Sequence, residues 1–149
     1  MRYQNQYDTL AVLVRAATRS EDAQSRVVFY LHDNFGHYSW VGIYRLEGQE
    51  LVLGAWQGKS PTPHPRIAVG NGICGDCAVS CRTEVVPDVG ADARYLVCFS
   101  ETRSEIVVPV VKAGKLWGEI NVDSSKPDAF GPDDVEFLEA TARLLAERV

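Results

Sequence analysis

The residues of this chain that are best suited to chemistry are its four cysteines, Cys74, Cys77, Cys81 and Cys98. The chain begins MRYQNQYDTL, which lacks the apolar stretch of a secretory signal. We therefore expect a cytoplasmic protein, in which a structural disulfide scaffold is unusual. A cysteine cluster in that setting more often binds a metal, carries out catalysis or responds to redox conditions.

Metal binding is the first interpretation of the cluster. Cys74 and Cys77 have the spacing of a ligand pair, and four thiolates would suffice for tetrahedral zinc or an iron–sulfur cluster. Cys98, however, has no close partner in the sequence, and Cys74 need not converge with Cys77 and Cys81 if the latter two lie one turn apart on a helix. We predict no metal site, with a thiolate site kept as an alternative.

Thiol redox chemistry is the second interpretation. A reactive cysteine needs a helix N-terminus or a neighbouring cation to lower its pKa. Cys74 follows a glycine turn that should lead into a helix, and Cys98 lies between Arg94 and Arg103 in the sequence. A thiol in a loop with a second thiol in reach is typical of a nucleophile and its resolving partner. The alternative, that Cys98 is a small buried apolar residue, stays open.

The composition excludes other classes of function. The chain has 149 residues and a net charge of -5, without the basic block that gripping a phosphate backbone requires, so we expect no nucleic-acid partner. No apolar run approaches the roughly 20 residues of a membrane span. The fingerprints of serine hydrolases, P-loops, dinucleotide-binding folds and zinc peptidases are absent. We find no linker or repeat, and predict one domain over residues 1–149.

Hydrophobic periodicity predicts helices at both ends of the chain around an antiparallel sheet, which makes the fold class α+β. A polar loop over residues 88–102 is expected to cover a site. The expected helices lie around residues 10–17, 27–35, 75–81 and from 132 onwards, and the expected strands at 38–45, 51–56, 66–69, 83–86, 105–112 and 115–123.

The last predicted hairpin carries acidic residues on one face. Alternation along its second strand puts Leu116, Ile120 and Val122 on one side, and Trp117, Glu119, Asn121 and Asp123 on the other. With a short turn, Glu105 lies across from Asp123. Opposed like charges on neighbouring strands are destabilising unless a cation, such as a ligand ammonium, lies between them. The alternative is a solvated face with the register shifted by one residue.

Aromatic residues on the first predicted hairpin offer the wall of a small-ligand pocket. They are Trp40, Tyr44 and Trp56. Such residues line apolar ligand pockets in many proteins. The alternative is that they belong to the hydrophobic core.

An ordered set of segments resembles the free methionine-(R)-sulfoxide reductases, a family built on a single GAF domain. The segments run from Ser39 toward the C-terminal helix and are SWVGIY, LVLGAWQGK, VGNGICG, ARYLVC, SEIVVP and INVDS. The resemblance implies a GAF-like fold, with a central antiparallel sheet and the N- and C-terminal helices packed on one face. It also implies an oxidoreductase that uses no metal or organic cofactor.

The resemblance implies roles for individual residues. Cys98 would attack the sulfoxide sulfur and become a sulfenic acid, and Cys74 would resolve it as a disulfide that thioredoxin reduces. The substrate-binding residues implied by the matched motifs are Trp40, Tyr44, Glu105, Asn121 and Asp123. The ammonium of free methionine sulfoxide would supply the cation that Glu105 and Asp123 require.

Three departures from the family pattern bear on these expectations. His64 stands near the place where the family often has another resolving cysteine, Asn121 replaces the first acid of a D-x-D-S pattern, and Cys77 and Cys81 are additional. We expect Cys77 and Cys81 to be bystanders, with a role as further resolving thiols as the alternative. The competing function is a non-catalytic GAF sensor of a small ligand. A homodimer is a further expectation, since GAF proteins commonly dimerise.

Overall fold

The structure is a computed structural model that describes residues 1–149. Its centre is a six-stranded antiparallel sheet with the strand order β3-β2-β1-β6-β5-β4. β1 and β6 lie at the centre of the sheet, and both carry long buried stretches. The strands are β1 (Trp40–Glu47), β2 (Glu50–Gln57), β3 (Arg66–Ala68), β4 (Glu84–Val86), β5 (Ser104–Lys112) and β6 (Lys115–Ser124).

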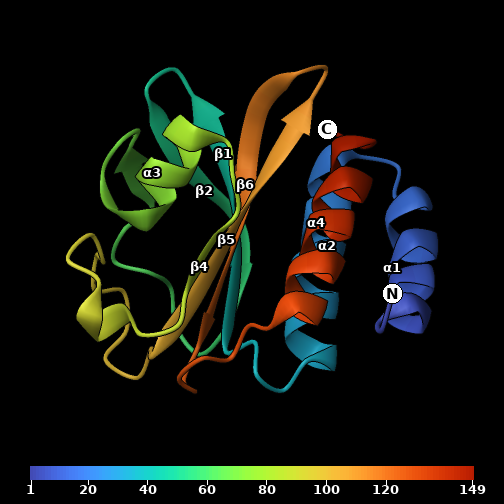
Figure 1. The fold of residues 1–149 in the computed structure, drawn as a ribbon. Coiled ribbons are helices and arrows are strands. Elements are labelled where there is room, and N and C mark those ends of the chain that lie inside the picture. Colours follow the sequence, from blue (N-terminus) through green and yellow to red (C-terminus); the bar gives the residue numbers. More distant parts are fainter.

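The helices form layers on the two faces of the sheet (Figure 1). On one face, α2 and α4 pack against the strands, and α1 packs mainly on those two helices as an outer layer. On the other face lies α3, together with the long loop before β5. The helices are α1 (Gln4–Arg15), α2 (Ser20–Asn34), α3 (Gly72–Ser80) and α4 (Pro132–Ala146). None of them could cross a membrane.

The C-terminal helix shows why the chain folds as the sequence predicts. Pro132 occupies the first helical position, where its missing N–H costs nothing. The carboxylate of Asp134 accepts a hydrogen bond from the backbone N–H of Gly131 at 3.0 Å and another from the hydroxyl of Tyr38 at 2.8 Å. A buried stripe that includes Leu138 and Leu145 then faces the sheet.

The predicted fold class, α+β with terminal helices on one face of an antiparallel sheet, is confirmed. The differences lie at element ends. The first strand begins at Trp40 rather than residue 38, and α3 begins at Gly72 rather than residue 75. The loop predicted over residues 88–102 is present, with one 3₁₀ turn at Val89–Ala91.

The expected position of Trp117 is wrong. The register of β5 and β6 pairs Val110 with Gly118 but Val111 with Leu116, so Trp117 is an extra residue in a β-bulge. A bulge reverses the alternation of side chains beyond it. Trp117 therefore packs against the helix-side core and not beside Glu119.

Each face of the sheet has its own core. The helix-side cluster comprises 24 buried residues from α1, α2, α4 and the sheet. The cluster under α3 is smaller, at 10 buried residues, and it includes Trp40, Tyr44, Cys74 and Cys77. The predicted functional residues belong to this second face.

Candidate active site

Three rows of residues cross the centre of the sheet on the α3 side. In the first row, Asp123 on β6 lies between Trp40 on β1 and Glu105 on β5. The predicted register of Glu105 and Asp123 is thus confirmed, and the alternative of a one-residue shift is wrong.

The second and third rows continue the same face along β6. Asn121 is paired with Gly42 and Val107, and Glu119 is paired with Tyr44 and Pro109. All five predicted substrate-binding residues are buried and lie within these rows.

The polar side chains of these rows are enclosed but lack hydrogen-bond donors. Glu119 is 0% exposed and Asp123 is 1% exposed, and both oxygens of each carboxylate have no partner. The Oδ1 atom of Asn121 and the hydroxyl of Tyr95 are also buried and unpaired. A buried polar group left unsatisfied costs about 1–3 kcal/mol, and more if it is charged. A ligand that donates several hydrogen bonds would remove part of this cost.

Burial also changes the charge of the acidic pair. Burial, and next the charge of Asp123, raise the pKa of Glu105 well above its usual range. Burial raises the pKa of Asp123 to about 6, and the nearby side chains of Glu105 and Thr102 act in the opposite direction. The pair therefore disfavours a state in which both carboxyl groups are charged.

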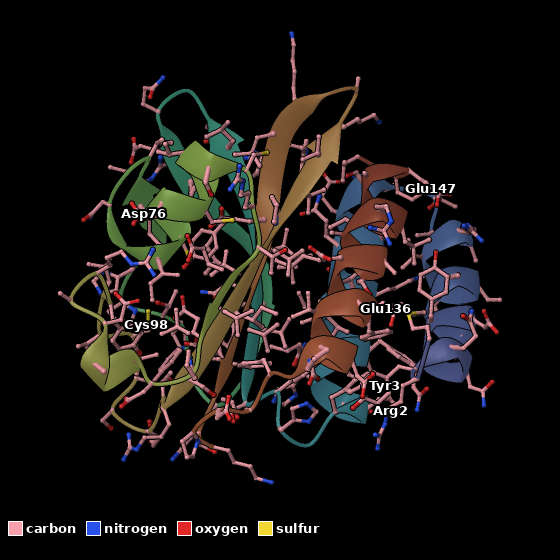
Figure 2. All side chains as sticks on the ribbon, in the orientation of Figure 1. Arg2, Tyr3, Asp76, Cys98, Glu136 and Glu147 are labelled. Carbon is pink, nitrogen blue, oxygen red and sulfur yellow. The ribbon has the colours of Figure 1, made fainter.

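Cys74 and Cys98 line one small cavity. It has a volume of about 10 Å³, and Glu105 and Asn121 form part of its wall. A space of this size holds about one water molecule and no amino acid. The structure therefore brings the two sulfur-bearing residues to the same cavity beneath the loop, in a closed arrangement. Figure 2 shows Cys98 on this loop, on the same side of the sheet as α3.

The expected activation of Cys98 by Arg94 and Arg103 is wrong. Arg94 is bound to Asp92, Asp76 and Glu84, and the guanidinium of Arg103 donates to the carbonyl groups of Ser100 and Thr102. Neither arginine is among the groups that shift the pKa of Cys98. Sequence proximity failed here because the arginines have other partners.

Both thiols are disfavoured as thiolates in this closed state. Burial, followed by the charge of Asp123, raises the pKa of Cys98 to about 12. Cys74 does lie in the first turn of α3, as expected, but burial and then the charge of Glu119 raise its pKa. The helix dipole therefore does not dominate at Cys74. Because the thiolate is the form that is oxidised, thiols that stay protonated beside carboxylates resist adventitious oxidation.

The loop that carries Cys98 is held by specific contacts at its two sides. The Arg94 guanidinium binds Asp76 on α3 at 3.1 Å and Glu84 on β4 at 3.3 Å. On the other side, the Nε2 atom of His64 lies 3.1 Å from the carbonyl oxygen of Val97. Near the place where the family often has another resolving cysteine, this chain therefore has a histidine that contacts the loop.

Trp40 lines a larger cleft on the same face. Its indole fits between Gly42 and Gly58, where an added Cβ would approach ring atoms to 2.3 Å and 2.4 Å. Its ring centroid lies 6.4 Å from that of Trp56, on which it stacks, and 5.7 Å from that of Phe99 in the loop. The open cleft has a volume of about 400 Å³, and both Trp40 and Asp123 line it. A small ligand in this cleft would lie beside Asp123, whose carboxylate is buried in the closed state.

The remaining cysteines do not complete a metal site. Cys77 is fully buried under α3, whereas Cys81 is exposed at the end of that helix. No group of three or more His, Cys, Asp or Glu side chains is arranged to hold a metal ion. The thiolate-metal alternative thus has no structural support.

Three further residues beside the site, Glu119, Tyr95 and Thr62, had no predicted role. Glu119 could have been found from the sequence, since strand alternation places it on the face of Asn121 and Asp123. Tyr95 and Thr62 lie in loops, where no periodicity predicts the direction of a side chain. The hydroxyl of Tyr95 is buried near Cys98 and Asp123, and Thr62 is buried near Cys98.

The sequence profile of the GAF domain matches residues 4–149. This chain belongs to the GAF domain family. The resemblance stated from its motifs is confirmed by relatives of known type. A free methionine-R-sulfoxide reductase of Saccharomyces cerevisiae is 39% identical over 111 residues, which cover 72% of this chain and 61% of the yeast protein. The match thus spans less than two thirds of that relative.

Solved structures give the same picture of the family. A free methionine-R-sulfoxide reductase from Neisseria meningitidis in complex with its substrate is 32% identical, with a TM-score of 0.92 over 98% of this chain and 87% of that one. A putative GAF sensor protein from Burkholderia vietnamiensis is 34% identical, with a TM-score of 0.92 over 99% and 92%. The two functions expected from the sequence are thus both represented among similar proteins.

Proposed function

We propose that this GAF domain protein is an oxidoreductase that reduces free methionine-(R)-sulfoxide to methionine, with Cys98 as the nucleophile. The observation that carries the proposal is the set of buried, unpaired acceptors next to the cavity of Cys98 and Cys74. The similar reductases from yeast and Neisseria support the choice of substrate.

Asp123 is the group that holds the substrate ammonium in this proposal. It carries the negative charge of the acidic pair and has two oxygens without a donor. Asn121, in the next row of β6, adds a neutral acceptor where the family pattern has a second acid. A site built for a free ammonium rejects an amide at the same place, because the buried acceptors would stay unpaired. Peptide-bound methionine sulfoxide is therefore excluded.

Glu105 is the proton donor for the sulfoxide oxygen. Burial and the charge of Asp123 raise its pKa, which favours the protonated form, and it lines the same cavity as Cys98. The Cys98 sulfur attacks the sulfoxide, the sulfur–oxygen bond breaks, and the oxygen ends on Cys98 as a sulfenic acid while methionine leaves. The substrate gains two electrons and Cys98 loses them.

Cys74 resolves the sulfenic acid. Its sulfur forms a disulfide with Cys98, and the oxygen leaves as water. A thioredoxin-like dithiol then reduces the disulfide by exchange, in the cytoplasm. No organic cofactor takes part in any of these steps. Since the cavity holds only about one water, the loop over residues 88–103 has to open for substrate to enter.

The proposal is tested by an assay of methionine formation from both diastereomers of the free sulfoxide and from a peptide-bound sulfoxide, coupled to thioredoxin. The wild-type protein should reduce only the free (R) form, and Cys98→Ser should lose turnover by at least 10³-fold. Cys81→Ser removes an exposed thiol and serves as the matched control with unchanged activity. Turnover retained in Cys98→Ser would overturn the assignment.

A small-ligand sensor is the second candidate, because the Burkholderia protein of comparable similarity is named a putative GAF sensor protein. A sensor would bind a small molecule in the cleft beside Trp40 without consuming it. It has no need of two thiols on one cavity, which favours the reductase. Ligand binding by the wild-type protein without methionine formation would support the sensor.

A further inference from the structure

The inner face of α3 carries a second thiol that the proposed reaction does not use. Cys77 follows Cys74 by three residues in the segment Cys74-Gly75-Asp76-Cys77. It is 0% exposed and belongs to the same buried cluster under the helix. Its sulfur lies 4.0 Å from the carbonyl oxygen of Val107 on β5. Cys77 therefore points at the sheet and not at solvent.

Cys74 and Cys77 are neighbours on one helix. Both lie within α3, which begins at Gly72. Residues three apart on a helix have Cβ atoms about 5–6 Å apart, and a disulfide requires about 3.5–4.5 Å, so the first turns of α3 have to tighten for the bond to form. A Cys-x-x-Cys pair at the start of a helix is also the arrangement of dithiol redox motifs.

An acidic side chain acts on both thiols. After burial itself, the charge of Glu119 on β6, a strand that contacts α3, is the largest cause that raises the pKa of Cys74 and of Cys77, while its own oxygens have no hydrogen-bond partner. The other ionisable group in its row is Tyr44, whose hydroxyl donates elsewhere, to the carbonyl of His64 at 2.9 Å. The remaining neighbours of like charge are Glu105 and Asp123. No cation is among the groups that act on Glu119.

The three thiols are ordered by depth. Cys98 is half-buried in the loop and shares its cavity with Cys74, which is 6% exposed. Cys77 is 0% exposed and does not line that cavity. Cys74 therefore shares a cavity with Cys98 and a helix with Cys77.

We propose that Cys77, with the ionised form of Glu119 as its proton acceptor, takes the disulfide over from Cys98 after each reduction. This inference rests on the proposed function, which supplies the Cys98–Cys74 disulfide. The Cys77 sulfur attacks the Cys74 sulfur, the Cys74–Cys77 bond forms and the Cys98–Cys74 bond breaks. The electron pair of the broken bond leaves on Cys98, which takes a proton from Glu105 on the wall of its cavity and becomes a thiol, while the proton of Cys77 passes to Glu119. The exchange involves no net oxidation.

We call this transfer of the disulfide from Cys98 to Cys77 the relay. It predicts how many substrate molecules one chain reduces without an external reductant. The first molecule produces the Cys98–Cys74 disulfide, and the transfer to Cys77 restores the Cys98 thiol. A second molecule then leaves Cys98 as a sulfenic acid. The chain therefore forms two methionines rather than one, and the Cys74–Cys77 disulfide stores the first oxidation until a reductant arrives.

The experiment counts methionine released per chain by reduced protein mixed with excess free methionine-(R)-sulfoxide in the absence of reductant. The wild-type protein and the control variant Cys81→Ala should both form two. Cys77→Ala should form one, and Cys77→Ser, which retains a hydroxyl donor to Glu119, should also form one. In Glu119→Gln, the second methionine should form at least 10-fold more slowly relative to the first than it does in the wild-type protein.

Peptide mapping locates the disulfide independently of the count. Trypsin separates residues 67–82, which contain Cys74, Cys77 and Cys81, from residues 95–103, which contain Cys98. After one equivalent of substrate, the Cys81→Ala protein should show the loss of two hydrogens within peptide 67–82, and Cys77→Ala should show the two peptides linked.

The outcomes separate the relay from the reductase. One methionine from the wild-type protein, or two from Cys77→Ala, would overturn the relay and leave the reductase intact. No methionine from any variant would overturn the reductase and the relay with it. Thermal unfolding of each variant checks that the loss of the second methionine does not come from a misfolded chain.

Discussion

Glu119 is the residue whose presence is hardest to explain by stability. It is fully buried without a donor for either oxygen, and burial raises its pKa to about 8. A glutamine or an apolar residue at this place would avoid the cost of burying a carboxylate. Stability alone therefore does not account for Glu119, whereas a role in proton transfer beside two thiols does.

The pH dependence of stability tests this environment. The pKa of Glu119 is about 8 in the folded state against 4.5 for an unperturbed glutamate. Between these pH values the folded protein binds the extra proton, so the free energy of unfolding falls as pH rises, by an amount on the order of 3–5 kcal/mol. Glu119→Gln should remove this part of the slope, as measured by chemical denaturation from pH 5 to pH 9.

Glu136, an exposed glutamate on α4, provides the matched control (Figure 2). Glu136→Gln should leave the pH slope unchanged. Burying the new amide in Glu119→Gln changes the free energy of unfolding by the same amount at every pH. It does not affect the test, because only the slope of that free energy against pH is compared. An identical slope in Glu119→Gln and wild type would show that this carboxylate titrates normally.

At the scale of elements, the loop over residues 88–103 decides whether the site is open or closed. Its principal side-chain anchor is Arg94, which joins Asp92 within the loop to Asp76 and Glu84 outside it. Partly exposed ion pairs contribute at most about 1 kcal/mol each and weaken with salt. The loop is therefore held firmly enough to protect Cys98 and loosely enough to move.

Arg94→Ala should release the loop without unfolding the protein. We expect amide hydrogen exchange of residues 92–100 to accelerate by about 10-fold or more, while the amides of α4 keep their protection. The melting temperature should fall by only a few degrees. Lys112→Ala, which removes an exposed cation far from the loop, is the control. Unchanged exchange in the loop would mean that Arg94 does not hold it.

The element scale also shows what the sequence could and could not predict. The partnership of Glu105 and Asp123 followed from alternation and a short turn, and the structure confirms it. Trp117 was misplaced because a bulge changes alternation without a signal in the residue types. The role expected of Arg94 was wrong because ion-pair partners depend on tertiary contacts that no local pattern encodes.

At the scale of the whole molecule, the sheet separates stability from chemistry. The helix-side cluster holds most of the buried apolar residues, and the α3-side cluster holds the thiols and acids. The two clusters share the same strands but face opposite directions. A change in one core should therefore reach the other only through the backbone of the sheet.

Adjacent valines on β5 test this separation. Val107 faces the thiols and Val108 faces the helices, and both are almost fully buried. Val107→Ala and Val108→Ala should lower the free energy of unfolding by similar amounts, about 1–2 kcal/mol. Only Val107→Ala should change kcat/KM for the sulfoxide. Equal effects of both variants on kcat/KM would mean that the sheet transmits core changes to the site.

The placement of the three tryptophans has an optical consequence. Trp40 and Trp56 stack at the edge of the cleft beside Asp123, whereas Trp117 packs on the opposite face of the sheet. Arrival of a zwitterion at Asp123 would alter the surroundings of the first two indoles and leave the third as a constant background. The intrinsic emission of the unlabelled protein can thus report occupancy of the cleft in real time.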